Sequence, residues 1–111
     1  MEERIKISLL IDLYGSLLTE KQKEIMNLYY NDDLSLGEIA EIMNTSRQAV
    51  FDIIKRCDKL LLEYEEKLNL LENENKKMIF KENLLKMLQT ISTNNMDSEI
   101  DKIKNYVLEN I

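Results

Sequence analysis

The chain has 111 residues, a formal net charge of −6, one cysteine and no histidine. One cysteine excludes an intrachain disulfide, and the lack of histidine excludes histidine-based catalysis and most zinc sites. The acidic balance argues against non-specific coating of nucleic acid. No apolar run approaches the ~20 residues that cross a bilayer, and the first residues lack the pattern of a signal peptide. We therefore expect a cytoplasmic, non-enzymatic protein without membrane insertion, metal or cofactor.

Composition favours an all-α fold. There is no proline, and the only glycines are Gly15 and Gly37, so the turn residues that an all-β domain needs are missing. Charge is spread unevenly, because residues 35–60 hold four acids and four bases, whereas residues 61–111 hold ten acids and seven bases. Contact with phosphates is therefore permitted through the middle of the chain.

Apolar residues at helical spacing predict a first helix near residues 3–14, which Gly15 and Ser16 end. A second helix is expected over about 20–30, followed by a turn at 31–33. Three pairs have the spacing of a capping box, in which a hydroxyl and a longer side chain satisfy the first free amides of a helix. These pairs are Thr19 with Gln22, Ser35 with Glu38, and Thr45 with Gln48.

The last predicted capping box opens a long helix whose apolar residues step alternately by four and three. This heptad seam is formed by Val50, Ile54, Cys57, Leu61, Tyr64, Leu68 and Leu71. If the helix continued, Asn75 would occupy an a-type position, where asparagine favours two strands. The polar run at 72–77 is expected to bend or stop the helix. A further helix is predicted over about 78–91, then a loop at 92–98 and a last helix capped by Asp97.

Residues 36–55 fit the steric pattern of a helix-turn-helix. Ala40 falls where the two helices touch and only a small side chain fits. Asn44 falls in the turn, where its tolerance of the left-handed conformation is useful. Val50 and Ile53 fall at the core positions of the second helix. An ordinary helical hairpin is the alternative, but the small residue, the turn residue and the core positions agree with one another.

Three stretches make a more specific resemblance. "LLTEKQKEIMNLYY", "DDLSLGEIAEIM" and "SRQAVFDIIKRCDKLLLEYEEKL" resemble the YlxM family of small bacterial helix-turn-helix proteins, which are similar to region 4 of the primary sigma factors. The resemblance covers about residues 5–71. It implies a sigma region-4-like module with no enzymatic activity. It also implies an accessory or regulatory part in the signal recognition particle pathway, with the particle's protein or RNA as a possible partner.

The exposed face of the second motif helix is the predicted nucleic-acid interface. Arg47 could bind guanine and Gln48 adenine, while free amides at the helix start suit a phosphate. Phe51 could meet a thymine methyl, but Asp52 would place a negative charge against a polyanion. The alternative for Asp52 is a local ion pair with a basic side chain such as Lys55. We expect weak binding of DNA or RNA by Thr45, Ser46, Arg47, Gln48, Phe51, Asp52, Lys55 and Arg56. The alternative is a protein-interaction module anchored by Phe51.

The heptad seam also has two interpretations. It packs against other helices of the same chain, or it meets its twin in a homodimer, which would supply a second recognition helix. Cys57 lies on this seam and is expected to be a buried small hydrophobe rather than a nucleophile. We predict a helix-turn-helix domain over 1–71, including the start of the long helix, and a C-terminal helical extension over 72–111.

Overall fold

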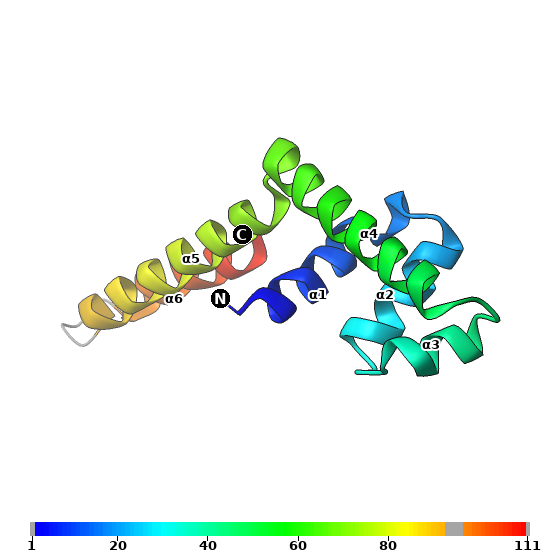
Figure 1. The fold of residues 1–111 in the computed structure, drawn as a ribbon. Helices are drawn as coiled ribbons and strands as arrows, with labels where there is room; N and C mark the ends of the chain where they lie inside the picture. The colour runs from blue at the N-terminus through cyan, green and yellow to red at the C-terminus, as the bar shows by residue number, and fades with distance from the viewer. Residues whose placement is uncertain (1, 93–96, 111) are drawn as a thin grey trace. The chain divides into compact units, whose positions relative to one another are not determined.

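The computed structural model describes residues 2–92 and 97–110, and within them it is all-α, as predicted (Figure 1). No strand occurs in these two ranges. Six α-helices and one short 3₁₀ helix follow one another in the described chain. They are α1 (Glu3–Tyr14), η1 (Gly15–Leu17), α2 (Glu20–Tyr30), α3 (Leu36–Ile42), α4 (Arg47–Leu68), α5 (Leu70–Ser92) and α6 (Asp97–Asn110).

Contacts divide the chain into two compact units, Met1–Leu71 and Glu72–Ile111. The first unit holds α1 to α4 around one apolar core, and α4 contacts each of the three helices before it. The most deeply buried side chains come from all four helices and include Leu10, Tyr14, Ile25, Met26, Ile39, Val50, Cys57 and Leu61. Full burial of a large aliphatic side chain contributes about 1.5–3 kcal/mol, so this shared core holds the four helices together.

Capping explains where the short helices begin. The boxes predicted at Thr19 and Ser35 are both confirmed, with the side chain of residue N3 returning to the cap amide in each. The third predicted box is wrong, because Ser46 and not Thr45 caps α4, accepting from the Ala49 amide at 3.1 Å.

The reason lies in how α3 ends. Asn44 takes a left-handed conformation, with φ at 52°, as its place in the turn predicted. The Asn44 amide donates to the Glu41 carbonyl and the Thr45 amide donates to the Ala40 carbonyl, which is the Schellman pattern of helix termination. Thr45 therefore completes the end of α3, and the next hydroxyl along the chain becomes the cap of α4.

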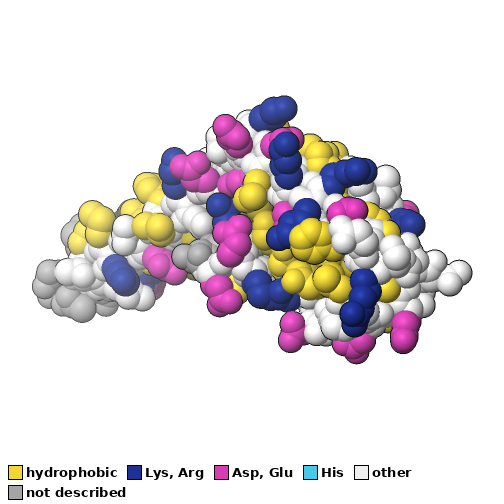
Figure 2. Space-filling view, viewed as in Figure 1, with side chains coloured by type: hydrophobic (Ala, Val, Ile, Leu, Met, Phe, Trp, Pro, Cys, Tyr) yellow, Lys and Arg dark blue, Asp and Glu magenta, His cyan; other side chains and the backbone are white. Residues whose placement is uncertain are grey.

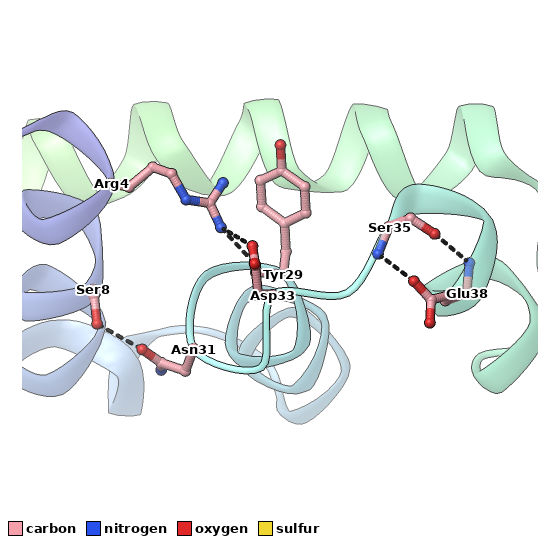
Figure 3. A network of polar contacts seen from close by, with 7 residues as sticks. All are labelled: Arg4, Ser8, Tyr29, Asn31, Asp33, Ser35 and Glu38. Atoms are coloured by element: carbon pink, nitrogen blue, oxygen red, sulfur yellow. Dashed lines mark hydrogen bonds and ion pairs between the residues drawn. The ribbon is translucent and has the colours of Figure 1, made fainter.

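A tether fixes α1 against the end of α2, and the sequence did not reveal it (Figure 3). The Arg4 guanidinium donates to the Tyr29 carbonyl at 2.8 Å and lies 3.3 Å from the Asp33 carboxylate. It also lies 4.9 Å and 5.0 Å from the ring centroids of Tyr29 and Tyr30. Nearby, the Ser8 hydroxyl donates to the side-chain oxygen of Asn31. Arg4 thus satisfies a free carbonyl at the C-terminal end of α2.

The long helix does not run through residue 71. It ends at Leu68, Asn69 takes a left-handed conformation with φ at 53°, and α5 begins at Leu70. The predictions that the polar run at 72–77 interrupts the helix and that the next helix begins near residue 78 are therefore wrong. The seam is interrupted at the same place, since Leu68 is 52% exposed. Asn75 consequently does not continue a straight heptad seam.

A buried tyrosine and a carboxylate hold this break. The Tyr14 hydroxyl donates to Glu65 Oε1 at 2.8 Å and accepts from the Leu70 amide at 3.1 Å. The same Glu65 oxygen accepts from the Leu71 amide at 3.0 Å. These contacts satisfy two of the amides that the start of a helix leaves free. We call Tyr14, Glu65, Asn69, Leu70 and Leu71 the α4–α5 joint.

The second unit consists of most of α5 together with α6. Its buried apolar residues are Leu88, Ile100 and Val107. Only four residues separate the end of α5 from the start of α6, a length typical of two antiparallel helices, and Figure 1 shows the two helices running in opposite directions. Ser92, Asp97 and Ser98 of the predicted loop are helical. Its middle, residues 93–96, and the capping role of Asp97's side chain lie outside what the structure describes.

Candidate nucleic-acid interface

The helix-turn-helix is formed by α3, the turn at Asn44 and the first half of α4 (Figure 1). Ala40 is buried where α3 meets α4, and Ile39 and Val50 are fully buried beside it. Ile53 is half-buried against the same core. The residues that the motif assigns to the inside are thus inside, which leaves the opposite side of α4 facing outward.

The predicted interface residues lie on that outward side. Thr45 is half-buried, and Phe51 is 41% exposed. The others are exposed, namely Ser46, Arg47, Gln48, Asp52, Lys55 and Arg56. We call these eight residues the α4 face. Six of them, from Arg47 to Arg56, lie on the first three turns of α4, while Ser46 caps this helix and Thr45 precedes the cap.

Two contacts organise the α4 face. Gln48 Nε2 donates to Asp52 Oδ1 at 2.9 Å, and Lys55 Nζ lies 5.5 Å from the centroid of the Phe51 ring. The predicted local ion pair of Asp52 with Lys55 or Arg56 is not formed in the described structure. The carboxylate instead orients an amide, and the ammonium covers an aromatic ring as in other cation–π pairs.

Arg47 has a position that the sequence did not predict. A Cβ atom added to Gly37 would lie 2.7 Å from Arg47 Nη2 and 3.0 Å from Arg47 Nε. The guanidinium therefore lies against the backbone of α3, where only glycine leaves room for it. The sequence did offer one signal of this contact, because Gly37 lies within the first turn of a helix, where no chain reversal requires a glycine.

An open concavity of about 700 Å³ adjoins Arg47 on the side of α3. Glu38 and Glu41 contribute carboxylates to its wall. Hydrogen bonds with Ser35 lower the pKa of the Glu38 carboxyl, so this side chain is an anion at neutral pH. The concavity thus joins two carboxylates of α3 with Thr45 and Arg47 of the α4 face.

Comparison with known proteins agrees with this geometry. A family described as "Putative helix-turn-helix protein, YlxM / p13 like", UPF0122, matches residues 1–105. The chain belongs to the UPF0122 family. It is 52% identical over 111 residues to a UPF0122 protein of Clostridium kluyveri, with both chains fully covered. It is 54% identical to one of Clostridium perfringens, covering 100% of this chain and 97% of the relative. A relative in Clostridium botulinum is 61% identical over 89 residues, 80% of this chain and 82% of the other.

UPF0122 membership covers both units, because the match reaches residue 105, whereas the resemblance stated from sequence covered about residues 5–71. The description of the family names a helix-turn-helix, which agrees with the motif formed by α3 and α4. None of the helices that the structure describes is both long enough and apolar enough to cross a membrane.

Most seam residues of α4 lie in the core of the first unit, although Leu68 is exposed. Val50, Ile54, Cys57 and Leu61 are all buried there against the other helices of the same chain. Burial raises the pKa of the Cys57 thiol, which keeps it protonated and a poor nucleophile. Of the two interpretations of the seam, the structure shows packing within the chain, so these side chains are not available to a second copy.

Proposed function

We propose that this UPF0122 protein binds nucleic acid, DNA or RNA, through the α4 face and acts as a non-enzymatic accessory or regulatory protein in the cytoplasm. One observation carries the proposal. The apolar side of α4 is seated in the core, while Arg47, Lys55 and Arg56 are all exposed on its first three turns. A rigid helix that presents cations and hydrogen-bonding side chains has the chemistry for phosphate and base contact.

The same face limits the affinity. Three cations neutralise at most about three phosphates, so the logarithm of the binding constant should fall with the logarithm of salt concentration with a slope of roughly −3. Asp52 opposes this attraction, and it also holds the Gln48 amide that base reading would use. We expect weak binding that physiological salt largely suppresses.

Charge reversal on the α4 face tests the proposal. Arg47→Glu combined with Lys55→Glu should abolish the salt-sensitive anisotropy change of a labelled DNA duplex or a labelled RNA hairpin. Lys67→Glu is the matched control, because this exposed lysine lies on the same helix roughly 18 Å beyond Lys55 at 1.5 Å per residue. Binding that survives the double reversal, or that Lys67→Glu reduces equally, would refute this use of the face.

The resemblance to the YlxM family extends the proposal to the signal recognition particle, through its RNA, its protein or the expression of its genes. Isolation of the tagged protein from its host, with identification of co-purifying RNA and protein over a salt series, tests this extension. Failure to recover any component of the particle would remove the extension and leave nucleic-acid binding to be judged separately.

A second candidate function rests on Phe51, an aromatic side chain 41% exposed in the middle of the α4 face. Aromatic residues are enriched among the anchors of protein interfaces, and Lys55 covers this ring rather than leaving it bare. Under this alternative, Phe51→Ala weakens partner capture while the double charge reversal leaves it largely intact. The two variants together therefore separate a nucleic-acid partner from a protein partner.

A further inference from the structure

The second unit exposes a row of large apolar side chains. On α5, Phe80 is 58% exposed, Met87 63% and Ile91 47%, and on α6 Ile103 is 48% exposed. Figure 2 shows hydrophobic side chains at the surface of this part of the chain. Single exposed apolar residues are normal, whereas a contiguous group marks an interaction surface.

Helical geometry places these side chains together. Phe80, Leu84, Met87 and Ile91 step by four, three and four residues, so they form one stripe along α5. Relative to the buried Leu88, Met87 lies one position before and Ile91 three positions after.

The stripe on α6 has the same offset. Ile103 lies three positions after the buried Ile100, as Ile91 lies three after Leu88. In antiparallel helices, equal offsets from the contact residues point to the same side of the pair. We call Phe80, Leu84, Met87, Ile91 and Ile103 the hairpin face.

Charge is absent from this stripe. The charged residues of α5 between Ile79 and Ile91 are Lys81, Glu82 and Lys86, and none falls on the four-three-four series. The polar neighbours Asn83 and Thr90 are uncharged. Depletion of charge at an apolar centre, with polar residues around it, is the composition of a protein–protein interface core.

We propose that the hairpin face binds the same face of a second copy of this chain, so that two α5–α6 pairs form a four-helix bundle. The area agrees with such a dimer. Four side chains of the hairpin face are about half exposed. If a large side chain has roughly 200 Å² of surface, these four supply about 400 Å² of apolar surface, and the half-buried Leu84 adds less. An interface of ~800 Å² per partner that is ~57% apolar requires about the same.

A second copy fits this surface better than a charged partner does. The five side chains of the hairpin face are all uncharged, so they offer an acidic or basic ligand no ion pair, and they can meet their own copies across a two-fold axis. A pair of amphipathic helices buries its remaining apolar side when it pairs with another such pair. The α4 seam, which the sequence offered as a dimer surface, is already buried within one chain.

Sedimentation equilibrium of the full chain over a concentration series tests the proposal without any nucleic acid, so its outcome is independent of the proposed function. The unmodified chain should form a dimer. Met87→Lys and Phe80→Lys should each raise the dimer dissociation constant at least ~30-fold, as loss of an interface hot spot does.

Asn75→Lys is the matched control. It adds the same charge to α5 at an exposed residue on the opposite side of the helix, and should leave the dissociation constant unchanged. Because the substituted side chains are exposed, the far-ultraviolet circular dichroism of all variants should match that of the unmodified chain. A monomer at every concentration, or a dimer that neither Met87→Lys nor Phe80→Lys weakens, would overturn the proposal.

Discussion

Replacing Tyr14 by phenylalanine isolates the α4–α5 joint. The change keeps the ring, which is almost fully buried, and removes only the hydroxyl that donates to Glu65 and accepts from the Leu70 amide. A hydrogen bond to a charged group contributes about 1.5–3 kcal/mol, and an amide left without its partner costs a further ~1 kcal/mol or more. We expect the free energy of unfolding to fall by about 3 kcal/mol.

Urea unfolding followed by circular dichroism measures this loss. With a denaturant slope of roughly 1–2 kcal/mol per molar, the midpoint should fall by about 2 M. Tyr29→Phe is the control, because in the described structure the hydroxyl of Tyr29 makes no hydrogen bond, and its ring keeps the contact with Arg4. A loss below ~0.5 kcal/mol for Tyr14→Phe, or an equal loss for the control, would refute the view that the hydroxyl holds the joint.

Three further outcomes follow from the geometry. Gly37→Ala should raise the free energy of unfolding by up to about 0.5–1 kcal/mol through helix propensity, while the new methyl group displaces the guanidinium of Arg47. We therefore expect a more stable protein that binds nucleic acid more weakly. Unchanged binding would show that the position of this guanidinium does not matter for nucleic-acid binding. Asp52→Asn should strengthen nucleic-acid binding in anisotropy titrations because it removes a repulsive charge, and weaker binding would instead assign the carboxylate a direct contact. Burial and the hydrogen bond to Asp58 raise the pKa of Tyr30, so the tyrosine ionises at lower pH in the unfolded chain than in the folded one. Its contribution to stability is complete below about pH 10 and is lost as pH rises toward the folded pKa. In urea unfolding over this pH range, the loss of stability should be smaller for Tyr30→Phe than for the unmodified chain.

The first unit was largely predictable because its signals are local and agree with one another. Thr19 and Ser35 each stand three residues before a side chain that completes a capping box, and apolar periodicity follows both. The turn was readable for the same reason, since Asn44 is a residue that tolerates a left-handed conformation. The outward side of α4 could then be named from the spacing of Val50 and Ile53 alone.

The errors arose where a distant residue or a neighbouring turn decided the outcome. The heptad series passes through Leu68 and Leu71 without interruption, and the partner that ends the helix, Tyr14, is 56 residues from Leu70 along the chain. Asn69 was the only local signal of the break. At the start of α4, Thr45 and Ser46 are both capable of capping, and the bond from the Thr45 amide to Ala40 decides between them.

The position of Arg47 against Gly37 depends on packing between two helices, which no spacing rule contains. Likewise, Asp52 pairs with Gln48 rather than with Lys55, although both lie at suitable helical spacing from it. Sequence reasoning could name the members of the α4 face but not the contacts among them.

The α4–α5 joint also has a consequence for how the chain folds as it is made. Tyr14 leaves the ribosome early, yet its hydroxyl finds both of its partners only when the segment around residue 70 has been synthesised. Until then the Tyr14 hydroxyl at the end of α1 lacks the Leu70 amide as a hydrogen-bond donor. Completion of the first unit is thus linked to the synthesis of its last two residues. A nascent chain halted shortly before Leu70 would contain the whole helix-turn-helix without the bond between Tyr14 and the Leu70 amide.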